Sequence, residues 1–171
     1  PSGVGKDAVV RSLQKRDLQF HFVVTMTSRK PRSGEVDGVD YFFVSKEQFE
    51  ERIRTNGFIE HALVYQDYKG IPKDQIQSAF ASGRDVILRV DVQGARTLRA
   101  LFPDAVLIFL IPTNVQEWYE RLRNRKTETP ESLAVRLETA REELKRLPEF
   151  DYVVVNAQDR AYVAVAVPLA A

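Results

Sequence analysis

Short apolar runs alternate along the chain with longer stretches in which apolar residues recur at helical spacing. The apolar runs predict strands at Phe20–Val24, Tyr41–Val44, Phe58–Tyr65, Asp85–Val90, Ala105–Ile111 and Tyr152–Val155. The amphipathic stretches predict helices at Asp7–Lys15, from Ser45 to about Arg54, from Pro72 to near Gly83, at Val115–Arg125 and at Pro130–Leu147. This alternation is typical of an α/β fold in which helices flank a parallel sheet.

Breaks in the pattern separate these elements. Gly70-Ile71-Pro72 is expected to interrupt the chain before a helix, because proline is favoured at helix starts. The uninterrupted apolar run Val86-Ile87-Leu88 predicts a central strand. A polar link at 126–129 separates the last two predicted helices. The apolar tail at 162–169 is too short to span a bilayer, so we expect a frayed or edge segment there.

The composition is that of an ordinary globular domain, with 44% hydrophobic and 29% charged residues. We therefore expect one domain over residues 1–171, with a mobile sub-region. The formal net charge of +1 argues against a nucleic acid or membrane partner, so affinity for phosphate has to come from local arginine clusters. The chain has no cysteine, which excludes thiol chemistry within it and fits a cytoplasmic location. The oligomeric state is left open by these features.

The first residues, Pro1-Ser2-Gly3-Val4-Gly5-Lys6, match the end of the phosphate-loop pattern G-x-x-x-x-G-K-[ST]. Glycines let backbone N–H groups turn toward phosphate oxygens, and the positive end of the following helix favours anions. Lys6 would reach the terminal phosphates of a nucleoside triphosphate, which makes 1–7 a candidate ATP site. The alternative is a glycine-rich turn before a helix.

Asp7 stands where the pattern has a serine or threonine that holds magnesium. Its carboxylate could bind Mg²⁺ directly or through water, could repel the triphosphate, or could be only a favourable acid in the first turn of a helix. The first glycine of the pattern, and the strand that leads into such a loop, do not occur in this sequence. We therefore expect a gap in the sheet, and expect the sequence to be a piece of a longer active enzyme.

A second cluster of polar residues lies in the loop that begins at Ser28. Arg29 and Arg32 are three residues apart in a proline-stiffened segment, so both could bind one phosphate. Tyr41 could add a hydroxyl donor. The alternative is a solvated charged loop.

Across nearly its whole length, the sequence resembles the guanylate kinase family. The motifs that carry the resemblance are S-G-V-G-K at 2–6, T-S-R-x-P-R-x-G-E-x-x-G-x-D-Y-x-F-V at 27–44, F-I-E at 58–60, Y-K-G at 68–70, D-V-Q-G at 91–94, R-L-x-x-R-x-T-E-T at 121–129 and D-Y-V-V-V-N at 151–156. The resemblance implies a P-loop NTPase-like parallel sheet flanked by helices, with its first strand missing, a small GMP-binding β region at about 25–70 and a helical lid at about 121–136. It also implies transfer of phosphate from ATP, with Mg²⁺, to GMP or dGMP in purine nucleotide metabolism.

The resemblance assigns roles to single residues. Those implied to bind GMP are Thr25, Arg29, Arg32, Tyr41, Glu60, Tyr68, Lys69 and Asp91. Those implied to bind ATP are Pro1, Ser2, Gly3, Val4, Gly5, Lys6, Asp7 and Asn156. Those implied in catalysis are Lys6, Arg121, Arg125 and Arg136, and the candidate Mg²⁺ ligands are Asp7 and Asp91. A carboxylate such as Glu60 suits guanine, which presents an N1–H and an amino group side by side.

Three positions depart from the usual pattern of the family. Lys69 stands where many relatives have a tyrosine, and its charge could replace the tyrosine's phosphate contact. Ile71 stands where a hydroxyl residue can bond the guanine oxygen, and it cannot replace that bond. Arg89 stands at a usually acidic position. It could recognise the guanine oxygen or form a salt bridge to Glu60 or Asp91, and the salt bridge is favoured because a buried arginine needs a carboxylate partner.

Two other functions stay open on sequence grounds. A guanylate-kinase-like scaffold would bind peptides without catalysis, but it would have no use for Lys6 and the full set of arginines. A kinase for a ribosyl bisphosphate can carry Gly-Lys-Asp in its loop, but Glu60 and the arginine loop favour GMP.

Phosphoryl transfer to a phosphate oxygen needs no histidine base, so His21 and His61 are expected to be structural or solvated. Trp118 is expected to pack in a core.

Overall fold

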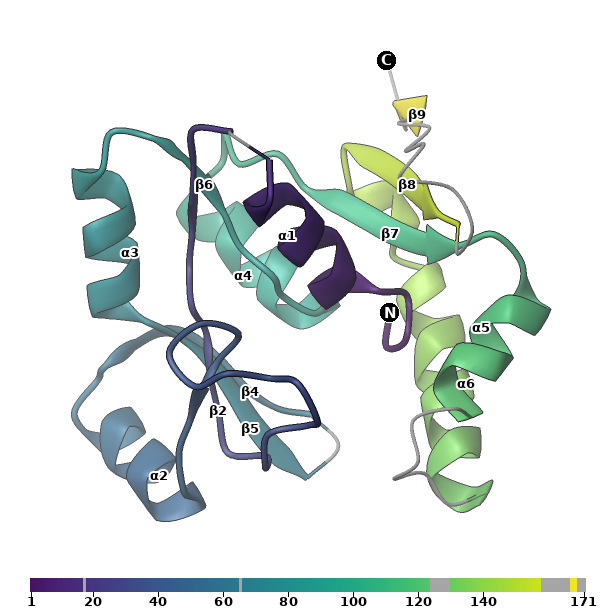
Figure 1. Cartoon of the computed structure of the whole chain (residues 1–171), viewed down its shortest axis with the longest axis horizontal. Helices are drawn as coiled ribbons and strands as arrows, with labels where there is room; N and C mark the ends of the chain where they lie inside the picture. Colours follow the sequence, from purple (N-terminus) through teal and green to yellow (C-terminus); the bar gives the residue numbers. More distant parts are fainter. Residues whose placement is uncertain (17, 65, 124–129, 158–166, 169–171) are drawn as a thin grey trace. The chain divides into compact units, whose positions relative to one another are not determined.

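The computed structural model describes residues 1–16, 18–64, 66–123, 130–157 and 167–168 (Figure 1). These residues divide into two compact units: a terminal unit, Pro1–Arg11 with Leu98–Ala171, and a middle unit, Ser12–Thr97. The helices α1 (Lys6–Gln14) and α4 (Val92–Leu101) each contribute residues to both units. Among the described helices, none is long and apolar enough to cross a membrane.

The middle unit contains a four-stranded sheet in the order β3-β2-β5-β4. Its strands are β2 (Met26–Thr27), β3 (Phe42–Phe43), β4 (Phe58–Val64) and β5 (Asp67–Pro72). β2 pairs parallel with β3 and antiparallel with β5, while β4 and β5 form an antiparallel hairpin. A separate parallel pair joins β1 (Phe20–Phe22) to β6 (Asp85–Ile87). The helix α3 (Lys73–Ala81) follows directly after β5.

Aromatic packing holds the β4–β5 hairpin against α2 (Lys46–Arg54). Phe49 of α2 is fully buried, and its ring stacks on Phe58 of β4 at 4.4 Å and on Tyr68 of β5 at 5.1 Å. The helix begins in a reciprocal capping box, because the side chains of Ser45 and Gln48 each accept a hydrogen bond from the other's backbone N–H. This packing fixes the strand that carries the predicted guanine-binding carboxylate.

The terminal unit contains β7 (Ile108–Pro112), β8 (Tyr152–Asn156) and β9 (Val167–Pro168). β8 lies in the middle, parallel to β7 and antiparallel to β9. Beside these strands lie α5 (Val115–Arg123), α6 (Pro130–Leu144) and the short 3₁₀ helix η1 (Leu147–Glu149) (Figure 1). The buried residues Val4, Trp118, Leu122 and Ala140 form one cluster, which packs the N-terminal loop against α5 and α6.

The predicted α/β class is confirmed, and most predicted elements lie within a few residues of the observed ones. The break expected at Gly70-Ile71-Pro72 is confirmed in part: Pro72 is the N-cap residue of α3, but the three residues also end β5, and all three are buried. Proline is tolerated there because it is the last residue of the strand. Gly70 leaves room for an aromatic ring, since a Cβ there would lie 2.8 Å from a ring carbon of Phe58.

Two more elements are absent from the prediction: the short strand β2 and the helix α4. Gly94 weakens the helical signal of α4. The structure offsets this cost at the helix start, where the Asp91 carboxylate accepts a hydrogen bond from the Gly94 N–H at 2.9 Å. The residues Val92, Ala95 and Leu98 are buried, so a helical spacing was present in the sequence.

The parallel strands among the described residues form three pairs, β1–β6 and β2–β3 in the middle unit and β7–β8 in the terminal unit. The edge segment expected in the apolar tail is confirmed for Val167–Pro168, which pair with β8 as the outer strand β9.

Candidate functional site

The phosphate loop has the backbone geometry that its glycines allow. Gly3 and Gly5 have φ values of 80° and 90°, a region that residues with a side chain rarely adopt. A Cβ at Gly3 would also lie 2.7 Å from Cδ2 of Leu122, and a Cβ at Gly5 would lie 2.3 Å from Nδ2 of Asn156. Both glycines are therefore required by conformation and by close packing. The loop leads directly into α1, whose N-terminal end carries the positive end of the helix dipole.

One face of α5 supports this loop through three residues at helical spacing. The indole N–H of Trp118 donates to the carbonyl oxygen of Ser2 at 2.7 Å. One turn further along α5, Arg121 donates to the carbonyl oxygens of Val4 at 3.4 Å and of Asn156 at 2.9 Å. Leu122 is fully buried against the loop. The helix therefore holds the carbonyl groups of the loop in place.

Asn156, at the end of β8, is a buried polar residue that completes this support. Its side-chain amide donates to the carbonyl oxygen of Val4 at 2.8 Å. Buried amides of this kind are costly unless they are hydrogen-bonded. Three groups of the predicted ATP and catalytic sets, namely the loop, Arg121 and Asn156, are thus brought together.

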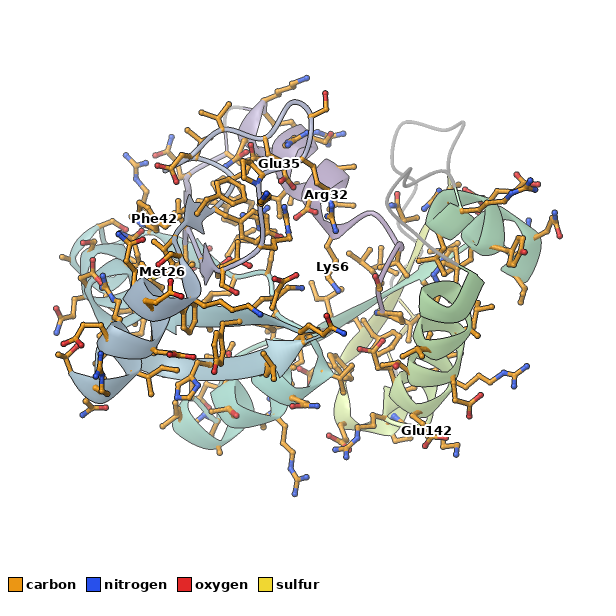
Figure 2. All side chains as sticks on the ribbon, turned by 90° about the horizontal axis from the view of Figure 1, so that it is seen from below. Lys6, Met26, Arg32, Glu35, Phe42 and Glu142 are labelled. Atoms are coloured by element: carbon orange, nitrogen blue, oxygen red, sulfur yellow. The ribbon has the colours of Figure 1, made fainter. Side chains whose placement is uncertain are left out.

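The loop lysine folds back onto its own loop. Lys6 is half-buried, and its Nζ donates to the carbonyl oxygen of Pro1 at 3.0 Å (labelled in Figure 2). Asp7 lies in the first turn of α1, where a carboxylate interacts favourably with the helix dipole. Arg121 also pairs with Glu117 on its own helix. Arg125 lies outside the described residues, and so does the side chain of Arg136.

In the middle unit, Arg29 is held by a carboxylate that the sequence reasoning did not assign. Its guanidinium forms two parallel hydrogen bonds to Glu35, from NH1 to Oε2 at 2.6 Å and from NH2 to Oε1 at 2.7 Å. Glu35 also accepts from the backbone N–H of Arg32 at 2.7 Å. Figure 2 labels Arg32 and Glu35 on this loop. Only 11% of the Arg29 side chain and 6% of the Glu35 side chain are exposed, so this is a desolvated ion pair.

The Glu35 carboxyl stays ionised because of these bonds. Burial alone would raise its pKa, but the hydrogen bonds from Arg29 and from the Arg32 backbone, with the two guanidinium charges, hold the pKa below its usual value. The sequence shows Glu35 at the end of the pattern R-x-x-R-x-x-E, in which Arg29, Arg32 and Glu35 follow one another at intervals of three residues. Only the folded loop shows that the two carboxylate oxygens of Glu35 accept two parallel hydrogen bonds from the Arg29 guanidinium.

Tyr41 lies between the arginine loop and a second arginine. The Cζ of Arg29 is 4.9 Å from the Tyr41 ring centre, and the Cζ of Arg89 is 4.7 Å from it. Arg89 also donates to the backbone carbonyl of Asp40. Asp40 is buried, and its carboxylate accepts from the Val36 N–H at 2.9 Å. The segment that presents Tyr41 is therefore held in place by hydrogen bonds at Val36 and Asp40.

Glu60 is a carboxyl group with a raised pKa. Burial, and to a smaller extent the nearby negative charge of Asp91, raise the pKa of Glu60 to about 7. Its Oε2 would lie 3.2 Å from a Cβ at Gly94, so the glycine at the start of α4 leaves room for this carboxylate. Glu60 and Asp91, both predicted to bind guanine, are thus neighbours. A desolvated carboxylate that still needs hydrogen-bond donors is suited to a base edge with two N–H groups.

Of the remaining predicted GMP residues, Tyr68 and Lys69 lie in β5 of the four-stranded sheet, and Thr25 directly precedes β2. Thr25 is buried, and its carbonyl oxygen accepts from the Phe42 N–H at 2.9 Å. Lys69 lies in β5, opposite Thr27 of β2. The Tyr68 ring stacks on Phe49, and its hydroxyl donates to Glu50 of α2 at 3.1 Å. These described contacts of Tyr68 involve α2 and none of the other residues predicted to bind GMP.

A pocket of about 330 Å³ opens beside β4 in the middle unit. Its lining residues are Ile53, Asn56, Phe58, Ile59, Glu60, His61 and Thr97. Glu60 is the one member of this set that the sequence predicted to bind GMP. His61 is an exposed member of β4, which agrees with its expected solvated role.

The described residues contain no group of three or more His, Cys, Asp or Glu side chains that could hold a metal ion. This is compatible with Mg²⁺, which is commonly held by one or two carboxylates together with the phosphates of a bound substrate. Asp7 and Asp91 are hard oxygen ligands of the right kind, and one oxygen of Asp91 is already used by the Gly94 N–H.

A glycine phosphate loop that enters a helix, in an α/β fold with parallel strands, defines a protein of the P-loop class. The comparisons with known proteins are more specific. The family model described as guanylate kinase matches residues 1–169. The chain therefore belongs to the guanylate kinase family.

Curated relatives and a solved structure agree with this assignment. The chain is 55% identical over 159 residues to guanylate kinase 2, chloroplastic/mitochondrial, of Oryza sativa subsp. japonica, an alignment that covers 92% of this chain and 56% of that protein. It is 43% identical to the guanylate kinase of Latilactobacillus sakei, over 91% of this chain and 77% of that protein. The crystal structure of guanylate kinase from Anaplasma phagocytophilum matches with a TM-score of 0.71 and 28% identity, over 90% of this chain and 72% of that one. The chain thus spans only part of the length of these relatives.

Proposed function

We propose that this protein transfers the terminal phosphoryl group of ATP to GMP, and also to dGMP, to form the corresponding diphosphate. The observation that carries the proposal is the acceptor side of the site. There, Arg29 and Tyr41 lie in one anchored loop, and Glu60 and Asp91 present carboxylates suited to guanine. Relatives named guanylate kinase at 40–55% identity support the same activity.

The proposed roles follow from charge and hydrogen bonding. The backbone of Pro1–Gly5 and the amino group of Lys6 bind ATP phosphates, and Arg29, Arg32 and Tyr41 bind the GMP phosphate. Glu60 accepts hydrogen bonds from the guanine N1–H and amino group, which adenine cannot offer in that arrangement. Asn156 supports the ATP side by holding the loop carbonyl of Val4.

Proton abstraction is not needed for this chemistry. The attacking group is a phosphate oxygen of GMP that is already anionic near neutral pH, so positioning and charge neutralisation carry the reaction. Lys6 and Arg121, with Arg125 and Arg136, are proposed to neutralise the charge of the transferring group. The segment 121–136 is proposed to act as a lid that excludes water, which would otherwise be phosphorylated in place of GMP.

Magnesium fits this site as a substrate-bound ion. Asp7 and Asp91 would be its protein ligands, directly or through water, and the ion would neutralise phosphate charge when bound.

The cellular compartment of the protein stays a prediction. A cytoplasmic location fits the composition, and the rice relative is named as a chloroplast and mitochondrial protein.

An ADP-release assay with GMP, dGMP, AMP and a ribosyl phosphate as acceptors tests the proposal. We expect GMP-dependent ADP formation, a smaller rate with dGMP, and little above the ATP-only background with AMP or the ribosyl phosphate. Absence of GMP-dependent ADP formation in a protein that still binds GMP would support the scaffold alternative. A rate with the ribosyl phosphate above that with GMP would support the other alternative.

A further inference from the structure

An ion pair on α5 lies directly beside the phosphate loop. The Arg121 guanidinium pairs with the carboxylate of Glu117, one helical turn earlier on the same helix. Only 17% of the Arg121 side chain and 14% of the Glu117 side chain are exposed. A guanidinium removed from water to this extent needs a counter-charge, because an uncompensated buried charge is costly. Glu117 supplies that counter-charge.

Arg121 connects two segments that are far apart in the sequence. It donates from NH1 to the carbonyl oxygen of Val4 at 3.4 Å and from NH2 to that of Asn156 at 2.9 Å. Val4 belongs to the phosphate loop, and Asn156 is the last residue of β8. The NH2 group that reaches Asn156 also donates to the Glu117 carboxylate. Since the guanidinium is planar, the carboxylate fixes the whole group where it joins the loop to the end of the strand.

The place of Glu117 in α5 offers a second reason for an acidic residue. Asn114 caps the helix, because its side-chain oxygen accepts a hydrogen bond from the Glu117 N–H at 2.8 Å. An acid in this first turn interacts favourably with the helix dipole. The carboxylate nevertheless turns forward along the helix to Arg121, on the side that supports the loop. The helix dipole alone does not explain that direction.

We propose that Glu117 is a positioning residue for ATP binding. Its carboxylate holds the Arg121 guanidinium against the loop carbonyl and the strand end, and so keeps the phosphate loop in the shape that receives the triphosphate. Glu117 does not touch the nucleotide in this role, because a carboxylate repels phosphate. The inference rests on the proposed function and adds to it an acid that acts on an anion site through the cation that it orients.

The sign of the effect on ATP affinity separates this role from simple charge repulsion. A negative charge near a triphosphate disfavours its binding, so removal of the Glu117 charge would strengthen ATP binding if charge alone mattered. The positioning role predicts the opposite, because a loosened Arg121 no longer holds the loop. A role confined to folding would lower the free energy of unfolding and leave the ATP affinity of the folded protein unchanged.

Calorimetry with ATP and with GMP tests the proposal on the unaltered protein, on Glu117→Gln and on a matched control. The control is Glu120→Gln, which removes the same charge from an exposed position of α5. We expect Glu117→Gln to weaken ATP binding about three- to tenfold, less than the loss of a direct charge-assisted bond to the ligand. GMP affinity should stay unchanged, and Glu120→Gln should leave both affinities within about twofold.

A second variant and a double-mutant cycle complete the test. Glu117→Asp keeps the charge and withdraws the carboxylate from Arg121 by a methylene group, so charge alone predicts no change and positioning predicts a loss. This variant decides the question should Glu117→Gln fail to fold. In an Arg121→Gln background, Glu117→Gln should cause no further loss, since the two residues act as a unit. A full additional loss there, or ATP binding that is unchanged or stronger in the single variants, would overturn the proposal.

The failure of this inference can be told apart from failure of the proposed function. The unaltered protein is assayed for GMP-dependent ADP formation under the same conditions. Activity there, combined with unchanged ATP affinity in both Glu117 variants, rejects the role of Glu117 alone. Absence of activity and of ATP binding in the unaltered protein rejects the proposed function, and this inference with it.

Discussion

At the scale of single residues, Glu60 is the group whose ionisation bears most directly on ligand binding. Burial and the Asp91 charge raise its pKa to about 7, and only the ionised carboxylate can accept both guanine hydrogen bonds. Guanosine affinity should therefore rise with pH through about 7, falling roughly tenfold per pH unit below that value. Titration with guanosine avoids the ionisation of the GMP phosphate. Glu60→Gln should bind more weakly and show no such step, and a pH-independent affinity in the unaltered protein would contradict this role.

The same raised pKa has an opposite consequence for folding. Because the folded protein holds the Glu60 proton more tightly than the unfolded chain does, the contribution of Glu60 to stability is present below its usual value of 4.5 and is lost as pH rises to about 7. Denaturant unfolding at several pH values should therefore show Glu60→Gln gaining stability relative to the unaltered protein across this interval. A constant difference between the two proteins would show that Glu60 titrates normally.

Glu35 is predicted to be structurally essential to Arg29, which is proposed to bind the GMP phosphate. Glu35→Gln leaves the desolvated Arg29 without its carboxylate, so we expect a loss of about 2–3 kcal/mol in the free energy of unfolding. GMP affinity should fall as well, because Arg29 would no longer be held in place. The matched control is Glu51→Gln, which breaks an exposed pair with Arg54 and should cost less than about 0.5 kcal/mol. Equal costs for the two variants would show that the Arg29–Glu35 pair adds nothing beyond a surface pair.

At the scale of secondary-structure elements, α5 acts as the support of the phosphate loop. Its buried face carries the hydrogen bond from Trp118 to Ser2 and the contacts of Arg121 with Val4 and Asn156. A change on that face should therefore affect ATP binding and leave the GMP side unaffected.

Trp118→Phe tests this role of α5. It keeps an aromatic ring in the core cluster and removes the indole N–H, so ATP affinity should fall about two- to tenfold, the effect of one neutral hydrogen bond. Tyr119→Phe, which changes the exposed neighbour on the same helix, is the control and should leave ATP affinity unchanged. Calorimetry with ATP and with GMP measures both. A loss confined to GMP binding would contradict the assignment of α5 to the ATP side.

Much of the element pattern was predictable, and the failures have local causes. The strands β4, β7 and β8 and the helices α2, α5 and α6 were predicted because their apolar spacing is regular. The strand β5 was missed because its Tyr68-Lys69-Gly70-Ile71-Pro72 sequence has no alternation and contains two chain-breaking residues. Its pairing with β4 and with β2 stabilises it, and β2 is distant in sequence.

At the scale of the whole molecule, the proposed reaction requires ATP and GMP to be held at the same time. A bisubstrate compound in which adenosine and guanosine are joined through a polyphosphate should therefore raise the melting temperature more than ATP and GMP do singly, because ligand binding to the folded state adds to its stability. The corresponding diadenosine compound is the control and should raise it less, since Glu60 disfavours adenine. Equal shifts for the two compounds would argue against a separate guanine site.

The family and the residue types of the site were readable from the sequence. The glycine spacing of the phosphate loop, the paired arginines and the motifs that contain Glu60 and Asp91 are local patterns, so the sequence alone displays them. The fold class was readable for the same reason, because hydrophobic periodicity reports each element separately.

Only the tertiary structure decided how these residues are partnered. It paired Glu35 with Arg29, turned Trp118 and Asn156 into supports of the phosphate loop, and brought Arg89 to Tyr41, which is 48 positions away in the chain. It also removed Glu60 from water, which raises its pKa. Partner choice and desolvation depend on the surroundings that folding assembles, so residue type and spacing alone do not determine them.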